Sequence, residues 1–186
     1  KTGRPVRMSM SRSEVFTGTG PTSATYVRAK IGAKNDGTLV AAEAYLAYEA
    51  GAFPGSPVGA GAGCMFASYN IPNQLTDAYD VVTNKPKVTA YRAPGSPQGT
   101  YAIESLMDDL ARKLDRDPME LRRQNASHEG TRRTDGTQNP RIGAEEVMDS
   151  AIESAHYRSE LSGSDRGLGV SMGFWQNGGM ESSAYA

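Results

Sequence analysis

The residues with the clearest chemical potential lie in one short stretch, residues 90–99, with the sequence AYRAPGSPQG. Arg92 stands there on a turn rich in proline and glycine, directly before a helical pattern. Free N–H groups and the helix dipole favour negative charge at the start of a helix. Arginine adds a rigid fork of donors that suits phosphate or carboxylate. The stretch therefore predicts a turn that faces an anion, and an ordinary surface arginine is the alternative.

The pattern after this turn predicts a helix over residues 101–114. Ser96 can cap the helix, and Pro97 suits its first position. Apolar residues recur at helical spacing and predict one buried face: Ile103, Leu106, Met107, Leu110, Ala111 and Leu114. Asp108 and Arg112 are expected to pair on the exposed face. Glu104 and Asp108 lie one turn apart, but we do not expect them to act as an acid–base pair.

Two further helices are predicted downstream. Asp117 is an N-cap followed by proline and an acidic third residue, which predicts a helix to about Gln124. Residues 144–155 carry apolar side chains at helical spacing and predict a third helix. The pairs at 122–123 and 132–133 are arginines, and we expect both to lie on a solvated surface because no aromatic residues alternate with them.

Alternating apolar and polar residues predict several strands. The alternation runs over residues 6–10, 27–33, 40–48 and 168–174, and residues 75–83 are also expected to form a strand. Asp36-Gly37 between the second and third runs predicts a hairpin, since glycine accepts a positive φ at little cost. The segment 51–63 is rich in small residues and predicts a loop that leads into a short helix near residues 64–68. A turn is expected over residues 175–179.

These elements together predict an α+β fold with mixed or antiparallel strands and a helical cluster after the Arg92 turn. We expect mainly strands and loops over residues 1–89, mainly helices over 90–158, and a returning strand and turn over 167–186. The chain has 186 residues and begins with lysine. We interpret it as one piece of a longer protein.

The composition argues against several classes of function. A formal net charge of −1 gives no overall attraction for nucleic acid or an anionic membrane, and no apolar run approaches the roughly 20 residues of a membrane span. One cysteine, Cys64, allows no internal disulfide and no cysteine-based metal cluster. His128 and His156 stand apart in the sequence, so neither is expected to bind metal.

Three ordered segments resemble one family, the molybdenum hydroxylases of the xanthine dehydrogenase and aldehyde oxidoreductase type. The family carries a turn of the form aromatic-Arg-Gly-x-Gly-x-Pro-Gln, and this chain has YRAPGSPQ over residues 91–98. A family helix with Leu-Met-Asp-x-Leu-Ala is matched by LMDDLA at 106–111, and a following segment by DPMELRRQN at 117–125. Smaller matches occur at 3–6, 36–39, 69–73 and 83–84.

The resemblance implies roles for particular residues of the turn. Arg92, Ala93, Gly95 and Gln98 would lie on the side of the molybdopterin cofactor, and Pro94 would form part of the substrate-pocket wall. Ala93 replaces the usual glycine, so we expect its backbone to avoid positive φ. Pro94 stands where several relatives have an aromatic ring, which puts aromatic clamping of a flat substrate in doubt.

The resemblance also implies an activity and partners. Such enzymes hydroxylate an aldehyde or N-heterocycle with water as the oxygen source, and electrons leave through 2Fe-2S centres, usually to FAD, on partner domains or subunits. The family's catalytic glutamate would lie beyond this chain, so we expect no catalytic residue here and no activity from this piece alone. We expect contacts with the rest of its own large subunit, and a cytoplasmic location.

The substrate class stays open at this stage. In purine-oxidising relatives a region like residues 59–69 supplies an arginine that anchors the substrate, but no arginine lies between Arg28 and Arg92. This argues against a purine, and a packing loop of small residues is the alternative for the region. Two other interpretations remain: a non-enzymatic scaffold that kept the fold and lost the cofactor, and an unrelated anion-binding domain.

Overall fold

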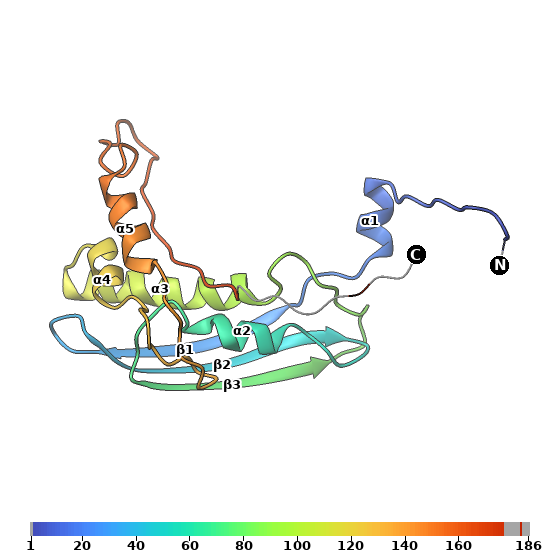
Figure 1. Cartoon of the computed structure of the whole chain (residues 1–186), viewed down its shortest axis with the longest axis horizontal. Helices are drawn as coiled ribbons and strands as arrows, with labels where there is room; N and C mark the ends of the chain where they lie inside the picture. Colours follow the sequence, from blue (N-terminus) through green and yellow to red (C-terminus); the bar gives the residue numbers. More distant parts are fainter. Residues whose placement is uncertain (1, 177–182, 184–186) are drawn as a thin grey trace.

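The computed structural model describes residues 2–176 and residue 183. Helices and strands follow one another along the chain as shown in Figure 1. In order they are α1 (Arg12–Gly18), β1 (Thr25–Ala33), β2 (Leu39–Gly51), α2 (Val58–Met65), β3 (Asn73–Val82), α3 (Ser96–Leu114), α4 (Pro118–Gln124) and α5 (Ala144–Glu153). The predicted α+β class is confirmed.

The sheet has the strand order β1-β2-β3 and is mixed. β1 and β2 are antiparallel and joined by the predicted hairpin, in which Gly37 has a φ of +85°. β3 pairs with β2 in parallel, and α2 lies in the connection between these two strands. The segment of small residues before β3 thus forms a helix that starts earlier than predicted, at Val58, and ends at Met65.

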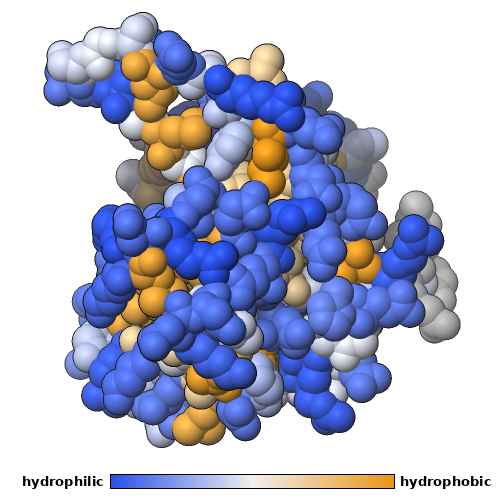
Figure 2. Space-filling model, turned by 90° about the vertical axis from the view of Figure 1, so that its left-hand side faces the viewer, coloured by the Kyte–Doolittle hydropathy of each residue, from blue (hydrophilic) through white to orange (hydrophobic). Residues whose placement is uncertain are grey.

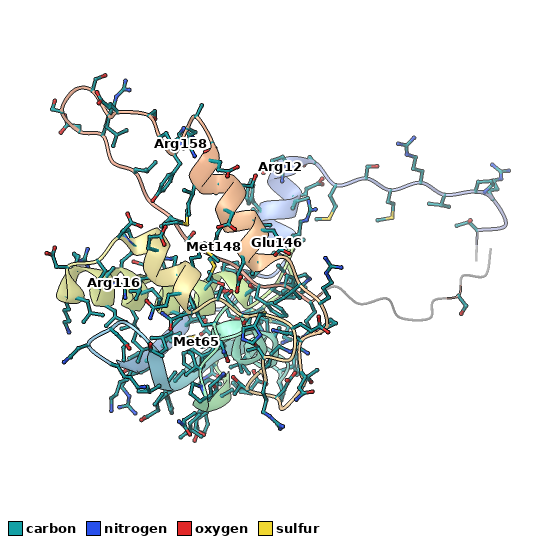
Figure 3. All side chains as sticks on the ribbon, turned by 60° about the vertical axis from the view of Figure 1, so that its left-hand side comes forward. Arg12, Met65, Arg116, Glu146, Met148 and Arg158 are labelled. Atoms are coloured by element: carbon teal, nitrogen blue, oxygen red, sulfur yellow. The ribbon has the colours of Figure 1, made fainter. Side chains whose placement is uncertain are left out.

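The helices α2 and α3 cover one face of the sheet, and the core lies between them (Figure 1). Alternate side chains of β2, among them Leu46 and Tyr48, point into this core and are fully buried. Met65 at the end of α2 lies between helices and sheet (Figure 3). Burying aliphatic and aromatic side chains of this size contributes about 1.5–3 kcal/mol each, so this core holds α3 and its preceding turn against the sheet.

Glycines let α2 approach its neighbours closely. A Cβ at Gly61 would lie 2.7 Å from the Tyr48 hydroxyl, and a Cβ at Gly99 would lie 3.1 Å from the carbonyl oxygen of Gly61. The small residues of α2 therefore pack against β2 and α3. For residues 59–69 the sequence had left such a packing role open as the alternative to anchoring a substrate.

A buried ionic network ties α3 to α4 and to the C-terminal segment. The Glu104 carboxylate accepts hydrogen bonds from Arg122 Nε at 2.8 Å, from the N–H of Met172 at 2.8 Å and from the Tyr69 hydroxyl. Arg122 also donates to Asp108 at 2.7 Å, and its side chain is fully buried. The surface position predicted for Arg122 and the pairing of Asp108 with Arg112 are both wrong.

The ion pairs on the surface of α3 and α4 differ from the predicted ones. Arg112 pairs with Asp109, one turn away on α3. Arg123, the neighbour of Arg122, is half exposed and pairs with Asp149 of α5 at 2.6 Å. Of these two neighbouring arginines, Arg122 is the one that pairs with Glu104 across the α3–α4 contact, and its side chain is buried.

The helices α4 and α5 agree with the sequence pattern. Asp117 caps α4 through hydrogen bonds to the N–H groups of Met119 and Glu120, as predicted. Met148 on α5 packs with Met119 in a small second core, and α5 rises from the body of the molecule (Figures 1 and 3). Figure 2 shows that polar residues dominate the end of the molecule near these helices, with apolar groups in small separate patches.

Two predicted strands are absent from the described residues. Residues 6–10 are extended and exposed, and residues 168–174 run alongside α3 without strand pairing. Both have the alternation of a strand, but a strand also needs a neighbouring strand for its backbone hydrogen bonds. The turn predicted over 175–179 falls mostly outside the described residues. Within the described part of the chain, no helix has the length and apolar character needed to cross a membrane.

Candidate cofactor-binding turn

The Arg92 turn is held at Gly95 by two tyrosine hydroxyls. Tyr48, from the buried face of β2, donates a hydrogen bond to the carbonyl oxygen of Gly95 at 3.2 Å. The Tyr91 hydroxyl accepts the N–H of Gly95 at 3.0 Å and donates to Gln98 Oε1 at 2.6 Å. Burial raises the pKa of Tyr48, so its hydroxyl remains a donor at ordinary pH. The turn is thereby tied to the sheet on one side and to α3 on the other.

Gly95 is the N-cap of α3, in place of the predicted Ser96. Its φ is +92°, and a Cβ there would lie 2.3 Å from the carbonyl oxygen of Pro57, so only glycine fits. Ser96 is the first helical residue, and its hydroxyl donates to the carbonyl oxygen of Phe174 at 2.9 Å. Ser96 thus fixes the C-terminal segment beside the turn.

Ala93 adopts the left-handed conformation that we expected it to avoid. Its φ is +55°, which makes it one of the non-glycine residues with positive φ among those described. The prediction for its backbone is therefore wrong. Hydrogen bonds to Gly95 and a bond from the Ser96 N–H to the Ala93 carbonyl at 3.3 Å enforce the glycine-type turn despite the side chain. The strain is about 1–2 kcal/mol.

Arg92 is exposed at the tip of this rigid turn. Its guanidinium forms no ion pair with any described residue. The backbone N–H groups of Arg92 and Ala93 also have no acceptor in the described part of the chain. Pro94, half-buried, has no N–H to offer. The turn therefore carries an exposed cation and backbone donors that have no acceptor among the described residues.

A large groove of about 1510 Å³ begins next to the turn. It lies between α1, β1 and α3, and its lining includes Tyr91, Pro97, Gln98 and Tyr101. Arg92, Ala93, Pro94 and Gly95 do not line it. Of the residues predicted for the cofactor site, Gln98 alone faces this groove, whereas the others form the adjoining turn.

The donor set suits the chemistry of a pterin cofactor with an anionic arm. A guanidinium, free backbone N–H groups and the Gln98 amide can donate to a phosphate and to pterin nitrogen and oxygen atoms. Gln98 Oε1 already accepts a hydrogen bond from Tyr91, which leaves its N–H groups as the free side of the amide. The residues present thus fit such a group, and they offer orientation rather than acid–base chemistry.

Comparison with known proteins identifies the family. Residues 1–126 match the model of the molybdopterin cofactor-binding domain. The chain belongs to this family of molybdenum hydroxylase domains. It is 34% identical to the aldehyde oxidoreductase of Megalodesulfovibrio gigas over 189 residues, which cover 95% of this chain and 20% of that protein. It is 37% identical over 133 residues to the xanthine dehydrogenase molybdenum-binding subunit of Escherichia coli O157:H7, covering 69% of this chain and 17% of that one.

Solved structures of molybdenum hydroxylases have the same fold. The quinoline 2-oxidoreductase of Pseudomonas putida 86 superimposes with a TM-score of 0.68 at 26% identity, over 81% of this chain and 20% of that chain. The aldehyde oxidoreductase of Desulfovibrio gigas gives a TM-score of 0.64 at 33% identity, over 76% of this chain and 17% of that one. The chain spans about a fifth of the length of these relatives.

Sequence reasoning missed the residues that hold the turn of this molybdopterin cofactor-binding domain. Tyr91 is part of the quoted motif, but nothing in its spacing indicates that its hydroxyl reaches Gly95 and Gln98. Tyr48 was visible only as an inward position of a strand. The signal that could have found it is a polar aromatic on an otherwise aliphatic buried face, since a buried hydroxyl needs a partner.

Proposed function

We propose that this chain is part of the large subunit of an oxidoreductase that hydroxylates an aldehyde or N-heterocyclic carbon, with water as the oxygen source. The observation that carries the proposal is Arg92, exposed and without an ion pair among the described residues, on a turn fixed by two tyrosines in a chain of the molybdopterin cofactor-binding family. When bound, the molybdenum cofactor supplies two-electron redox chemistry.

The residues of the turn have binding and orienting roles in this proposal. Arg92 and the free N–H groups at Arg92 and Ala93 hold the cofactor, and Gly95, buried against Pro57 and Gly61, allows the turn that positions them. Gln98 donates from α3, and Pro94 forms part of the substrate-pocket wall. Fixing these donors before binding lowers the entropy lost when the cofactor is ordered.

The wider assembly is also part of the proposal. Electrons would leave through 2Fe-2S and FAD groups on partner domains or subunits, in the cytoplasm, and the rest of the large subunit would supply the catalytic base. This chain alone would then bind part of the cofactor and turn over no substrate. Activity of the purified chain toward aldehydes or N-heterocycles above background would contradict this part.

A scaffold that lost the cofactor is the second candidate, and Ala93 and Pro94 suggested it. Ala93 has the left-handed backbone that glycine adopts readily, so the alanine is compatible with a glycine-type turn. The observation that still favours the scaffold is the missing aromatic ring at Pro94. Molybdenum and pterin analysis of the intact protein separates the two: a metal content near zero in well-folded protein favours the scaffold.

A further inference from the structure

We propose that the Tyr91 hydroxyl is a positioning group that turns the amide N–H groups of Gln98 toward the cofactor, an inference that rests on the proposed function. The hydroxyl has one proton to donate and two lone pairs. It accepts the Gly95 N–H at 3.0 Å, and its proton goes to Gln98 Oε1 at 2.6 Å. The turn and the first turn of α3 are joined through this one oxygen atom.

The Tyr91 bond decides which end of the Gln98 amide is free. Because Oε1 accepts from Tyr91, the two N–H donors of Gln98 are directed away from that hydroxyl. They have no acceptor among the described residues, and Gln98 is half-buried on the wall of the large groove. Without the Tyr91 proton, the amide could rotate and present its carbonyl oxygen, which repels an anionic or electron-rich ligand.

The fold itself does not depend on this hydroxyl. Tyr48 holds the carbonyl oxygen of Gly95 from β2, so the turn stays attached to the sheet when Tyr91 loses its oxygen. Phenylalanine retains the ring, so Tyr91→Phe removes two hydrogen bonds, the one to Gln98 Oε1 and the one from the Gly95 N–H, and leaves the packing of the ring in place. Its main consequence should appear in cofactor retention rather than in folding.

Tyr101 provides the matched control. It lines the same groove and lies on α3 close to Gln98, with 78% of its surface exposed. Its hydroxyl makes no hydrogen bond within the described part of the chain. Tyr101→Phe therefore removes the same atom from the same groove without touching the turn.

Gln98→Glu tests whether Tyr91 orients the N–H donors of Gln98 or only holds the turn in place. A carboxylate still accepts the Tyr91 proton, so the joint survives, but the two N–H donors are lost. If Tyr91 acts through Gln98, this variant loses cofactor although its turn is intact. A purely structural role for Tyr91 predicts that the effects of Tyr91→Phe and Gln98→Glu multiply in the double variant.

The experiment uses the intact protein that contains this chain and measures molybdenum per protein and the first-order rate of molybdenum loss on dialysis. We expect Tyr91→Phe to lose metal about tenfold faster than the unsubstituted protein, the size of one hydrogen bond, and Tyr101→Phe to match the unsubstituted protein. Gln98→Glu should lose metal at least as fast as Tyr91→Phe. The double variant should lose it no faster than Gln98→Glu alone.

Equal rates of molybdenum loss for Tyr91→Phe and Tyr101→Phe overturn the inference. Retention of the metal by Gln98→Glu also overturns it. So does a double variant whose increase in the rate of loss is the product of the increases in the two single variants. If Tyr91→Phe lowers the unfolding temperature of the cofactor-free protein, the rate of metal loss from the double variant relative to Gln98→Glu decides. Unsubstituted protein that binds no molybdenum overturns the proposed function and this inference together. Unsubstituted protein that binds it, with no effect of Tyr91→Phe, overturns the inference alone.

Discussion

The buried pair of Glu104 and Arg122 gives a prediction whose size follows from the structure. The side chain of Arg122 is fully buried and that of Glu104 is 6% exposed. Glu104→Gln removes the charge and leaves one acceptor oxygen where the carboxylate accepts three donors. Removing the buried partner of a buried charge costs about 3–5 kcal/mol, and since Arg122 keeps only the half-exposed Asp108 as an anionic partner, we expect the lower end of this range, a large share of the about 5–15 kcal/mol that stabilises a typical domain.

Amide hydrogen exchange in the intact protein measures this loss where it occurs. A cost of about 3–5 kcal/mol corresponds to a fall in protection of about a hundredfold or more in α4 and in residues 170–174. Asp108→Asn is the control, because Asp108 contacts the same guanidinium but is 48% exposed. Solvent screening limits its contribution to about 1 kcal/mol or less. Equal loss of protection in the two variants would refute the reasoning.

Three further predictions follow from the turn, the sheet edge and the buried thiol. Ala93→Gly should raise the free energy of unfolding by up to about 1 kcal/mol, measured by thermal unfolding. The reason is that the relief of strain at a φ of +55° exceeds the conformational entropy cost of glycine. A variant less stable than the unsubstituted protein would show that the turn carries no strain. Hydrogen bonds from Ser56 and Gly55 lower the pKa of Asp80 below 3.8, so its stabilising effect is present above the unfolded pKa and is lost as pH falls through the folded pKa. The stability gap to Asp80→Asn should begin to close below about pH 5 and disappear once the pH is below the folded pKa. A gap that widens on acidification contradicts this. Burial raises the pKa of the Cys64 thiol, and the residue is 2% exposed. The thiol should therefore react with a disulfide reagent at least about tenfold more slowly in the native than in the unfolded protein. Equal reaction rates in the two states would contradict the burial of Cys64.

The parts of the fold that the sequence predicted well depend on local patterns. The hairpin at Gly37, the cap at Asp117 and the apolar face of α3 each arise from residues within a few positions of one another. Such patterns act before any tertiary contact forms, so they can be recognised without the structure. The class of the fold follows from them.

The errors occurred where distant residues decide the outcome. Arg122 is buried because Glu104, on another helix, accepts its hydrogen bonds, and no local pattern shows this contact. Residues 168–174 alternate like a strand, but they lie beside α3 and bond to Glu104 through Met172. Ala93 takes a positive φ in a turn that a distant residue, Tyr48, helps to fix at Gly95. Each of these contacts overrides a local preference.

For the candidate site, the motif located the turn but not the means by which it is held. Arg92 is exposed and unpaired among the described residues, as a residue that faces a ligand requires. The hydroxyls of Tyr48 and Tyr91 meet at Gly95 from β2 and from the turn itself. That meeting depends on the packing of β2 against α3, which spacing along the chain does not reveal.

The most direct test of the cofactor-binding role is the molybdenum and pterin content of the intact protein, measured for the unsubstituted form and for Arg92→Met. Methionine keeps much of the length of arginine but removes the guanidinium donors. We predict close to one molybdenum per chain in the unsubstituted protein, and a reduction of about tenfold or more in Arg92→Met at an unchanged unfolding temperature of the cofactor-free forms. Equal molybdenum content in both forms would contradict the role of Arg92, and the absence of molybdenum from both would contradict the proposed function itself.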